Sequence, residues 1–254
     1  MGYYDMNKEE RKEFVLKMEE ELIDDLKNNK DSQTLHYSAD NDVYIRKNVS
    51  NILGRIYRDK GLFKDEIMHI AINLLKNDDE NVRQTAVYLL AEIGKKDADL
   101  VFEYLETALR DSHHKVRNGV MSALKIMGQA NPEPTLKFAK VFIHDSDPEV
   151  RRKVVHGIEL RGRTHPEDIL PLLKDLQDEN NPQVRKMIIH VLGQISYKKG
   201  CLEKVTSALK TWDNKELVED AIPYILEVHK KYPFSSRTPE EAENYLKENF
   251  KGFK

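Results

Sequence analysis

The chain has 254 residues, a formal net charge of −3, 33% charged residues and 39% hydrophobic residues. This balance excludes a protein that is basic throughout, as a general nucleic-acid binder would be, although a local basic face remains compatible with it. The single cysteine, Cys201, excludes an internal disulfide and a cysteine-based zinc site.

The N-terminal segment and the hydropathy of the chain bear on its location. No basic segment followed by an apolar stretch opens the sequence, and no run of 18 apolar residues occurs in it. We therefore expect a cytoplasmic, soluble protein without a membrane partner.

Apolar residues at helical spacing predict pairs of helices along the chain, and the alternation typical of strands is absent. The first pair is a charged helix from Asn7 to about Asn29 and a helix that begins at Asp42, with a polar loop from Asn28 to Asn41 between them. The expected pairs cover residues 7–58, 62–95, 97–129, 132–163, 166–198 and 201–231, and a closing helix covers residues 238–252.

Several residues predict where these helices begin and end. Gly94 and Gly128 are expected to end the second helices of their pairs, because glycine favours helix C-termini. Pro223 is expected to kink the last second helix or to shift its start. Thr238 followed by Pro239 favours a helix start, with the threonine as N-cap.

A Val-Arg step recurs along the chain at a fixed period. It occurs at Val82-Arg83, Val116-Arg117, Val150-Arg151 and Val184-Arg185, each 34 residues after the one before. A constant period in the thirties indicates stacked repeats. Tetratricopeptide repeats have this period too, but their Trp, Gly, Tyr and Pro pattern is missing here, so we rank them lower.

The repeated segments resemble HEAT repeats, including those found in bilin lyases. The resemblance lies in the Asp-x-x-Val-Arg-x-x-Ala pattern at residues 79–86 and in close copies at residues 147–151 and 181–185. It implies an all-α, right-handed α-solenoid of about six HEAT-like, armadillo-like helix pairs plus a C-terminal helix, forming one body over residues 1–254. Each repeated aspartate would cap a second helix, and each repeated arginine would pair with an acidic residue of a neighbouring turn.

The same resemblance implies that the second helices line a concave face. Positions 2, 6, 9 and 13 residues after each valine share one side of these helices, and this side is polar, basic to neutral, with Tyr and His. We expect it to bind an anionic or mixed partner; the alternative is an ordinary solvated helix face. The candidate binding residues are Lys47, Gln84, Tyr88, Asn118, Arg152, His156, Arg163, Lys186, His190 and Tyr197.

The fourth pair is unusual, because arginines and histidines gather in it and Gly157 lies within its second helix. Residues 150–157, 161–163, 166–173 and 184–186 resemble part of the bacterial DNA-alkylation-repair glycosylases built from HEAT-like repeats. That resemblance implies phosphate contacts by Lys47, Arg152, Arg163 and Lys186. Catalysis does not follow from it, because His113 and His156 stand where a carboxylate would be sought.

His156 and His190 occupy equivalent positions in successive repeats, within reach of a shared ligand or metal, but a chance pair on a solvated face is favoured. We predict no catalytic residue, cofactor or metal ion. The favoured function is a non-enzymatic scaffold that binds a protein partner. The alternative is a DNA-binding protein of the alkylation-repair class, with or without glycosylase activity.

Overall fold

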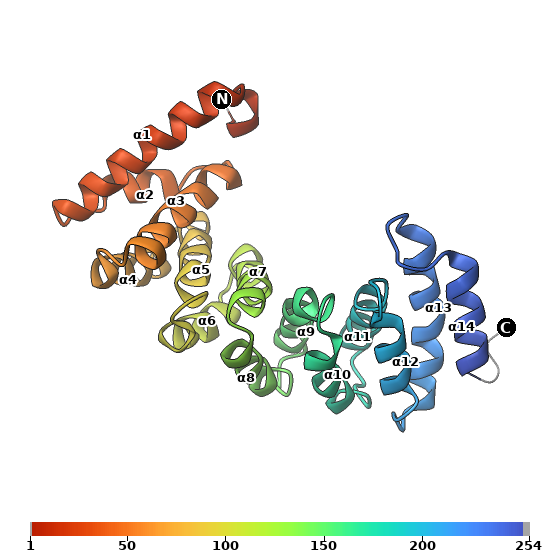
Figure 1. The fold of residues 1–254 in the computed structure, drawn as a ribbon. Helices are drawn as coiled ribbons and strands as arrows, with labels where there is room; N and C mark the ends of the chain where they lie inside the picture. The colour runs from red at the N-terminus through yellow and green to blue at the C-terminus, as the bar shows by residue number, and fades with distance from the viewer. Residues whose placement is uncertain (1, 251–254) are drawn as a thin grey trace. The chain divides into compact units, whose positions relative to one another are not determined.

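The computed structural model describes residues 2–250 of the chain. Within this range all regular elements are helices and no strand occurs, which confirms the predicted all-α fold (Figure 1). The contacts divide the chain into two compact units, unit 1 (residues 1–131) and unit 2 (residues 132–254). No helix of the described part is both long enough and apolar enough to cross a membrane.

Unit 1 consists of two layers of helices. Its α-helices are α1 (Lys8–Lys27), α2 (Ser32–Ser38), α3 (Val43–Arg55), α4 (Lys64–Leu75), α5 (Glu80–Gly94), α6 (Phe102–Leu109) and α7 (His114–Ala130). The second helices α3, α5 and α7 pack side by side in that order, and α4 and α6 cover one side of them. Between the two layers lie fully buried apolar side chains such as Leu53, Ile67, Leu89 and Leu124.

Unit 2 repeats this arrangement. Its α-helices are α8 (Pro132–Phe142), α9 (Pro148–Gly162), α10 (Pro166–Asp175), α11 (Pro182–Gln194), α12 (Cys201–Leu209), α13 (Lys215–Lys231) and α14 (Pro239–Asn249). The second helices α9, α11 and α13 form one layer, α10 and α12 lie against each other in the other, and α14 packs on α13. Trp212 is 1% exposed and lies in the core of this unit.

The turns before the second helices share one hydrogen-bond pattern. Asp42, Asp79 and Asp147 each accept a hydrogen bond from the backbone amide two residues further on, which confirms their role as N-caps. The repeated arginine then donates to two carbonyl oxygens of the turn before its own helix, five and six residues back. This contact is made by Arg46, Arg83, Arg117 and Arg151.

Two of the predicted arginine pairs with neighbouring turns form, those of Arg83 and Arg151, whereas Arg185 pairs with Glu216 and Asp220 on α13. Arg83 makes two hydrogen bonds to Asp111, of 2.7 and 3.0 Å, and Arg151 makes two to Glu179, of 2.6 and 2.9 Å. Each acidic partner lies 28 residues after its arginine, in the turn of the next repeat. These arginines therefore connect successive turns and are part of the framework.

Some expected helix bounds differ from the structure. The expected loop from Asn28 to Asn41 contains the helix α2. The expected first helix from Asp97 is split into a 3₁₀ turn, Ala98–Leu100, and α6. Gly94 does end α5, but Gly128 does not end α7, which continues to Ala130.

In the two C-terminal helices, α13 and α14, one of the two predicted helix-start signals agrees with the structure. Pro223 lies inside α13, which starts at Lys215 and continues to Lys231, so the proline does not shift the helix start. Thr238 caps α14 as predicted, accepting a hydrogen bond from the Glu241 amide. The expected end of this helix at residue 252 lies outside the described residues. The division of the chain into six repeats stays a prediction.

Candidate functional site

The ten candidate binding residues fall in both units. Lys47, Gln84, Tyr88 and Asn118 lie on α3, α5 and α7 of unit 1. Arg152 and His156 lie on α9, Arg163 directly follows that helix, Lys186 and His190 lie on α11, and Tyr197 follows α11. Each unit is therefore considered by itself.

In unit 1, four tyrosines and two cations form a cluster, which we call the tyrosine–cation cluster: Tyr3, Tyr4, Tyr44, Tyr88, Arg11 and Lys47. The ring centroids of Tyr4 and Tyr44 lie 4.5 Å apart, edge to face, and Tyr3 stacks on Tyr44 at 6.4 Å. Lys47 Nζ lies 5.9 Å from the centroid of the Tyr44 ring and 5.5 Å from that of Tyr88. Contacts of this kind between a cation and a ring face are attractive.

The N-terminal segment is held at this cluster by the cap of α3. The backbone amide of Tyr3 donates to Asp42 Oδ2 at 2.6 Å, and the amide of Tyr44 donates to Asp42 Oδ1. Burial opposes ionisation of Asp42, but hydrogen bonds from the Tyr3, Tyr44 and Ile45 backbone amides outweigh it and hold the pKa of Asp42 below its ordinary value. One ionised carboxylate thus fixes both the start of α3 and the segment that carries Tyr3 and Tyr4.

The tyrosine–cation cluster leaves a large aromatic area open to solvent. Tyr4 is 62% exposed and Tyr44 is 44% exposed, and Lys47 is exposed as well. Gln84, in contrast, is buried; its side chain accepts a hydrogen bond from Arg46 and donates one to the carbonyl oxygen of Lys115. Gln84 therefore connects α3, α5 and α7, which differs from its expected place on a solvated face.

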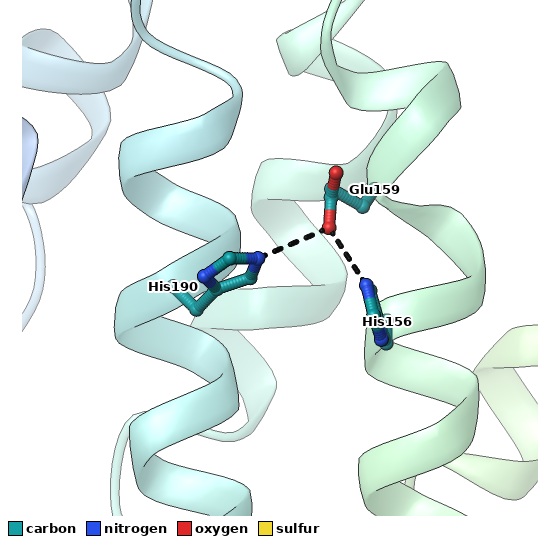
Figure 2. Close-up of side chains that lie close together, drawn as sticks. All are labelled: His156, Glu159 and His190. Atoms are coloured by element: carbon teal, nitrogen blue, oxygen red, sulfur yellow. Dashed lines mark ion pairs between the residues drawn. The ribbon is translucent and has the colours of Figure 1, made fainter. Parts of the chain in front are cut away.

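In unit 2, His156, Glu159 and His190 come together, and we call them the His–Glu–His cluster (Figure 2). Glu159 Oε2 lies 3.2 Å from His156 Nε2, on the same helix, and 3.5 Å from His190 Nε2, on the neighbouring helix. The Glu159 side chain is 1% exposed, whereas the His156 and His190 side chains are 25% and 34% exposed. The cluster thus consists of one buried carboxylate in contact with two imidazoles that solvent can reach.

Two further side chains orient this cluster. Arg163 donates hydrogen bonds to Glu159 Oε1 and to Gln194 Oε1, so the second carboxylate oxygen is already paired with a guanidinium. The Tyr224 hydroxyl lies 2.8 Å from His190 Nδ1, the ring nitrogen that does not face Glu159. Burial raises the pKa of Tyr224, and a hydrogen bond from Gln194 only partly offsets this, so the phenol stays neutral.

The remaining candidates of unit 2 have different environments. Arg152 and Lys186 lie on the neighbouring helices α9 and α11 and form no ion pair within residues 2–250. Lys186 is exposed, whereas Arg152 is half-buried and its Nε is buried without a hydrogen-bond partner. Tyr197 is 6% exposed, packed against Tyr232 and Phe234, and so lies in the interior instead of on the expected solvated face. Lys186 is therefore more accessible to an anionic partner than Arg152 is.

A protein-family model described as HEAT repeats matches residues 67–137 and 135–223. The chain belongs to the HEAT-repeat family. This assignment explains the capped turns and the arginine pairs described above, and it confirms the resemblance drawn from the sequence.

Solved structures of similar fold include AlkD2 from Streptococcus mutans, at 17% identity and a TM-score of 0.56 over 84% of this chain and 98% of that one. The smu.31 protein from Streptococcus mutans UA159 is 18% identical, with a TM-score of 0.49 over 68% of this chain and 96% of that one. Importin beta is 15% identical, with a TM-score of 0.47 over 82% of this chain and 31% of that one. No curated protein matches the chain. These likenesses concern the HEAT-repeat fold alone.

Within this HEAT-repeat framework, sequence reasoning missed the residue at the centre of the His–Glu–His cluster. Glu159 lies nine residues after its repeat valine, where three other repeats have the small residues Gly54, Ala91 and Gly193 and two have Lys125 and Glu227. A glutamate at this position, three residues after His156, was the sequence signal that could have indicated the cluster. Tyr3, Tyr4 and Arg11 were missed as well, because no local pattern connects them with α3.

Proposed function

We propose that this HEAT-repeat chain is a non-enzymatic scaffold that binds a protein partner, with the tyrosine–cation cluster of unit 1 as a main contact surface. The observation that carries the proposal is the exposure of Tyr4 and Tyr44, at 62% and 44%, beside the cations Lys47 and Arg11. Tyrosine and arginine are enriched among the residues that contribute most to protein–protein affinity.

The rings of this cluster are already ordered by their contacts with one another. The ring of Tyr4 contacts those of Tyr44 and Tyr3, at centroid distances of 4.5 and 5.6 Å, and Arg11 lies 5.2 Å from the Tyr4 ring centroid. A partner that covers such rings loses little side-chain entropy in the interface, because few torsions remain to be fixed. The cations at the edge favour a partner surface with acidic residues beside an apolar contact.

The test begins with the purified chain as bait, followed by binding measurements with each purified protein it retains. We expect Tyr4→Ala combined with Tyr44→Ala to weaken binding at least about 30-fold, since central aromatic residues contribute about 2 kcal/mol or more each. Phe234→Ala is the matched control, because Phe234 is an aromatic residue of unit 2 that is 67% exposed. A partner that binds the double variant as tightly as the wild type would exclude this surface.

A second candidate function is DNA binding, and a specific observation favours it. Arg152, which is half-buried, and Lys186, which is exposed, lie on neighbouring helices of unit 2, and neither forms an ion pair among the described residues. Two such cations can contact successive phosphates of a nucleic-acid backbone. Arg163 is a weaker candidate than expected, because its guanidinium is engaged with Glu159 and Gln194.

Fluorescence anisotropy with a short DNA duplex at about 50 and 200 mM salt separates the two candidates. DNA binding predicts micromolar affinity at low salt that falls steeply at the higher salt, and that is lost when Arg152 and Lys186 are both changed to Gln. If duplex DNA does not bind at either salt concentration, the DNA candidate is excluded. Tyr4→Ala with Tyr44→Ala, which leaves unit 2 unchanged, is the control in this assay.

A further inference from the structure

We propose that the His–Glu–His cluster of unit 2 is a binding site for a divalent transition-metal ion, with Zn²⁺ as the best-matched probe. His156, Glu159 and His190 each offer one ligand atom, and these three atoms lie within 4.8 Å of one another (Figure 2). The set contains two imidazole nitrogens and one carboxylate oxygen. This donor set matches the three protein ligands of open zinc sites.

The spacing of the ligand atoms fits metal coordination. Zinc bonds to nitrogen and oxygen are about 2.0–2.1 Å long, so neighbouring ligand atoms of a tetrahedral site lie about 3.3–3.4 Å apart. The two distances from Glu159 Oε2 to the imidazole nitrogens, 3.2 and 3.5 Å, lie on either side of that value. The two imidazole nitrogens lie within 4.8 Å of each other, so an ion bound between the three atoms requires the imidazole rings to move toward each other.

The local sequence places the ligands with little freedom. His156 and Glu159 are three residues apart on α9 and therefore share one face of that helix. His190 comes from α11, which packs directly against α9. Because Glu159 is 1% exposed, its carboxylate is confined, whereas the partly exposed imidazoles give an ion access from solvent. Three protein ligands leave a fourth coordination position for water or for a ligand group from elsewhere.

Tyr224 and Gly193 position His190. When the Tyr224 hydroxyl accepts a hydrogen bond from His190 Nδ1–H, Nε2 carries no proton, and its lone pair is free to bind an ion held between His190 and Glu159. Gly193 makes this contact sterically accessible, because a Cβ atom at this position would lie 2.6 Å from Tyr224 Cδ1. Tyr224 is thus a positioning residue that sets the tautomer of a ligand.

The ligand atoms of the cluster also indicate which class of metal ion it would bind. Ca²⁺ and Mg²⁺ prefer sites made of oxygen ligands, and this cluster has two nitrogens among three donors. Imidazole favours zinc, copper, iron and nickel. Arg163, paired with Glu159 Oε1, leaves Oε2 as the single carboxylate ligand atom. The site therefore suits a transition-metal ion with one monodentate carboxylate.

Isothermal titration calorimetry with Zn²⁺ on the chelator-treated full chain tests the proposal. We expect one ion per chain, with His190→Ala lowering the affinity at least tenfold and Tyr224→Phe lowering it about 10–100-fold. His165→Ala is the matched control, because His165 is an exposed histidine of unit 2 outside the cluster. Binding that is absent from the wild type, or equal in wild type and His190→Ala, would overturn the proposal.

Co²⁺ gives a second and independent readout. A site with three protein ligands and tetrahedral geometry produces visible d–d absorption when Co²⁺ replaces Zn²⁺. We expect this absorption in the wild type and in His165→Ala, and its loss in Glu159→Gln, with circular dichroism confirming that the variant is folded. If Glu159→Gln does not fold, His156→Ala takes its place, because the His156 side chain is 25% exposed. Absorption that persists in the ligand variant would contradict the assigned ligands.

Discussion

Arg151 and Arg185 occupy the same position in successive repeats of unit 2, but the structure places them in different environments. Arg151 makes two hydrogen bonds to Glu179 and two more to the carbonyl oxygens of Asp145 and Ser146. Within residues 2–250, the ion pairs of Arg185 are with Asp220 and Glu216, whose side chains are 51% and 83% exposed. We therefore expect the two arginines to contribute unequally to stability.

The expected magnitudes follow from the exposure of each pair. The Arg151 and Glu179 side chains are 16% and 8% exposed, so removal of the guanidinium leaves a largely buried carboxylate without its cation. Removing one partner of a buried pair costs about 3–5 kcal/mol. Because the pair keeps some exposure, we expect Arg151→Met to lower the free energy of unfolding by about 3 kcal/mol. Arg185→Met breaks an exposed pair, for which the cost is about 0–1 kcal/mol.

Urea unfolding followed by tryptophan fluorescence measures both variants with one probe. Trp212 is the only tryptophan of the chain, lies in unit 2 and is 1% exposed. Methionine retains the length of the arginine stem, so the comparison isolates the guanidinium. If the two substitutions lower the free energy of unfolding equally, the reasoning from burial and hydrogen-bond count is refuted.

The Glu179 carboxyl gives this prediction a pH signature. Burial raises the pKa of Glu179, but hydrogen bonds from Arg151 and the Asn181 amide outweigh it, so its pKa in the folded chain is below its ordinary value. The pair therefore contributes fully above the unfolded pKa of about 4.3, and the contribution is lost as the pH falls through the folded pKa. The difference in stability between wild type and Arg151→Met should shrink over that window.

Three further predictions concern other parts of unit 2. Burial lowers the pKa of His229, so the unfolded chain takes up a proton first as the pH falls below about 6.5. Unfolding free energy should fall by up to about 1.4 kcal/mol per pH unit there, and His229→Gln should flatten this slope in urea titrations; an unchanged slope would assign it to other groups. Gly193→Ala should destabilise by about 1–2 kcal/mol in thermal unfolding, because overpacking against the Tyr224 ring exceeds the helix-propensity gain; a stabilised variant would contradict the close approach. Thr238→Ala should cost about 1 kcal/mol, seen as faster hydrogen exchange in α14, because the capping box with Glu241 is lost; unchanged exchange would show that this cap does not limit opening of the helix.

The sequence by itself determined the repeat architecture. The aspartate caps, the Val-Arg steps and the apolar spacing act over a few residues, so each repeat carries its own folding signals. The pairing of Arg83 and Arg151 with the next turn was also predictable, because a constant period places equivalent residues side by side. The helix α2 was not, because its seven residues are too few to show a helical apolar period.

Only the tertiary structure decided which face positions are open and which side chains meet. Gln84 and Tyr197 occupy expected surface positions, yet packing against neighbouring elements buries them. Tyr3 reaches Asp42 across 39 residues, and His190 reaches Glu159 across 31. These contacts depend on how closely two helices approach, and that distance is set by the side chains between them, not by any spacing along the chain.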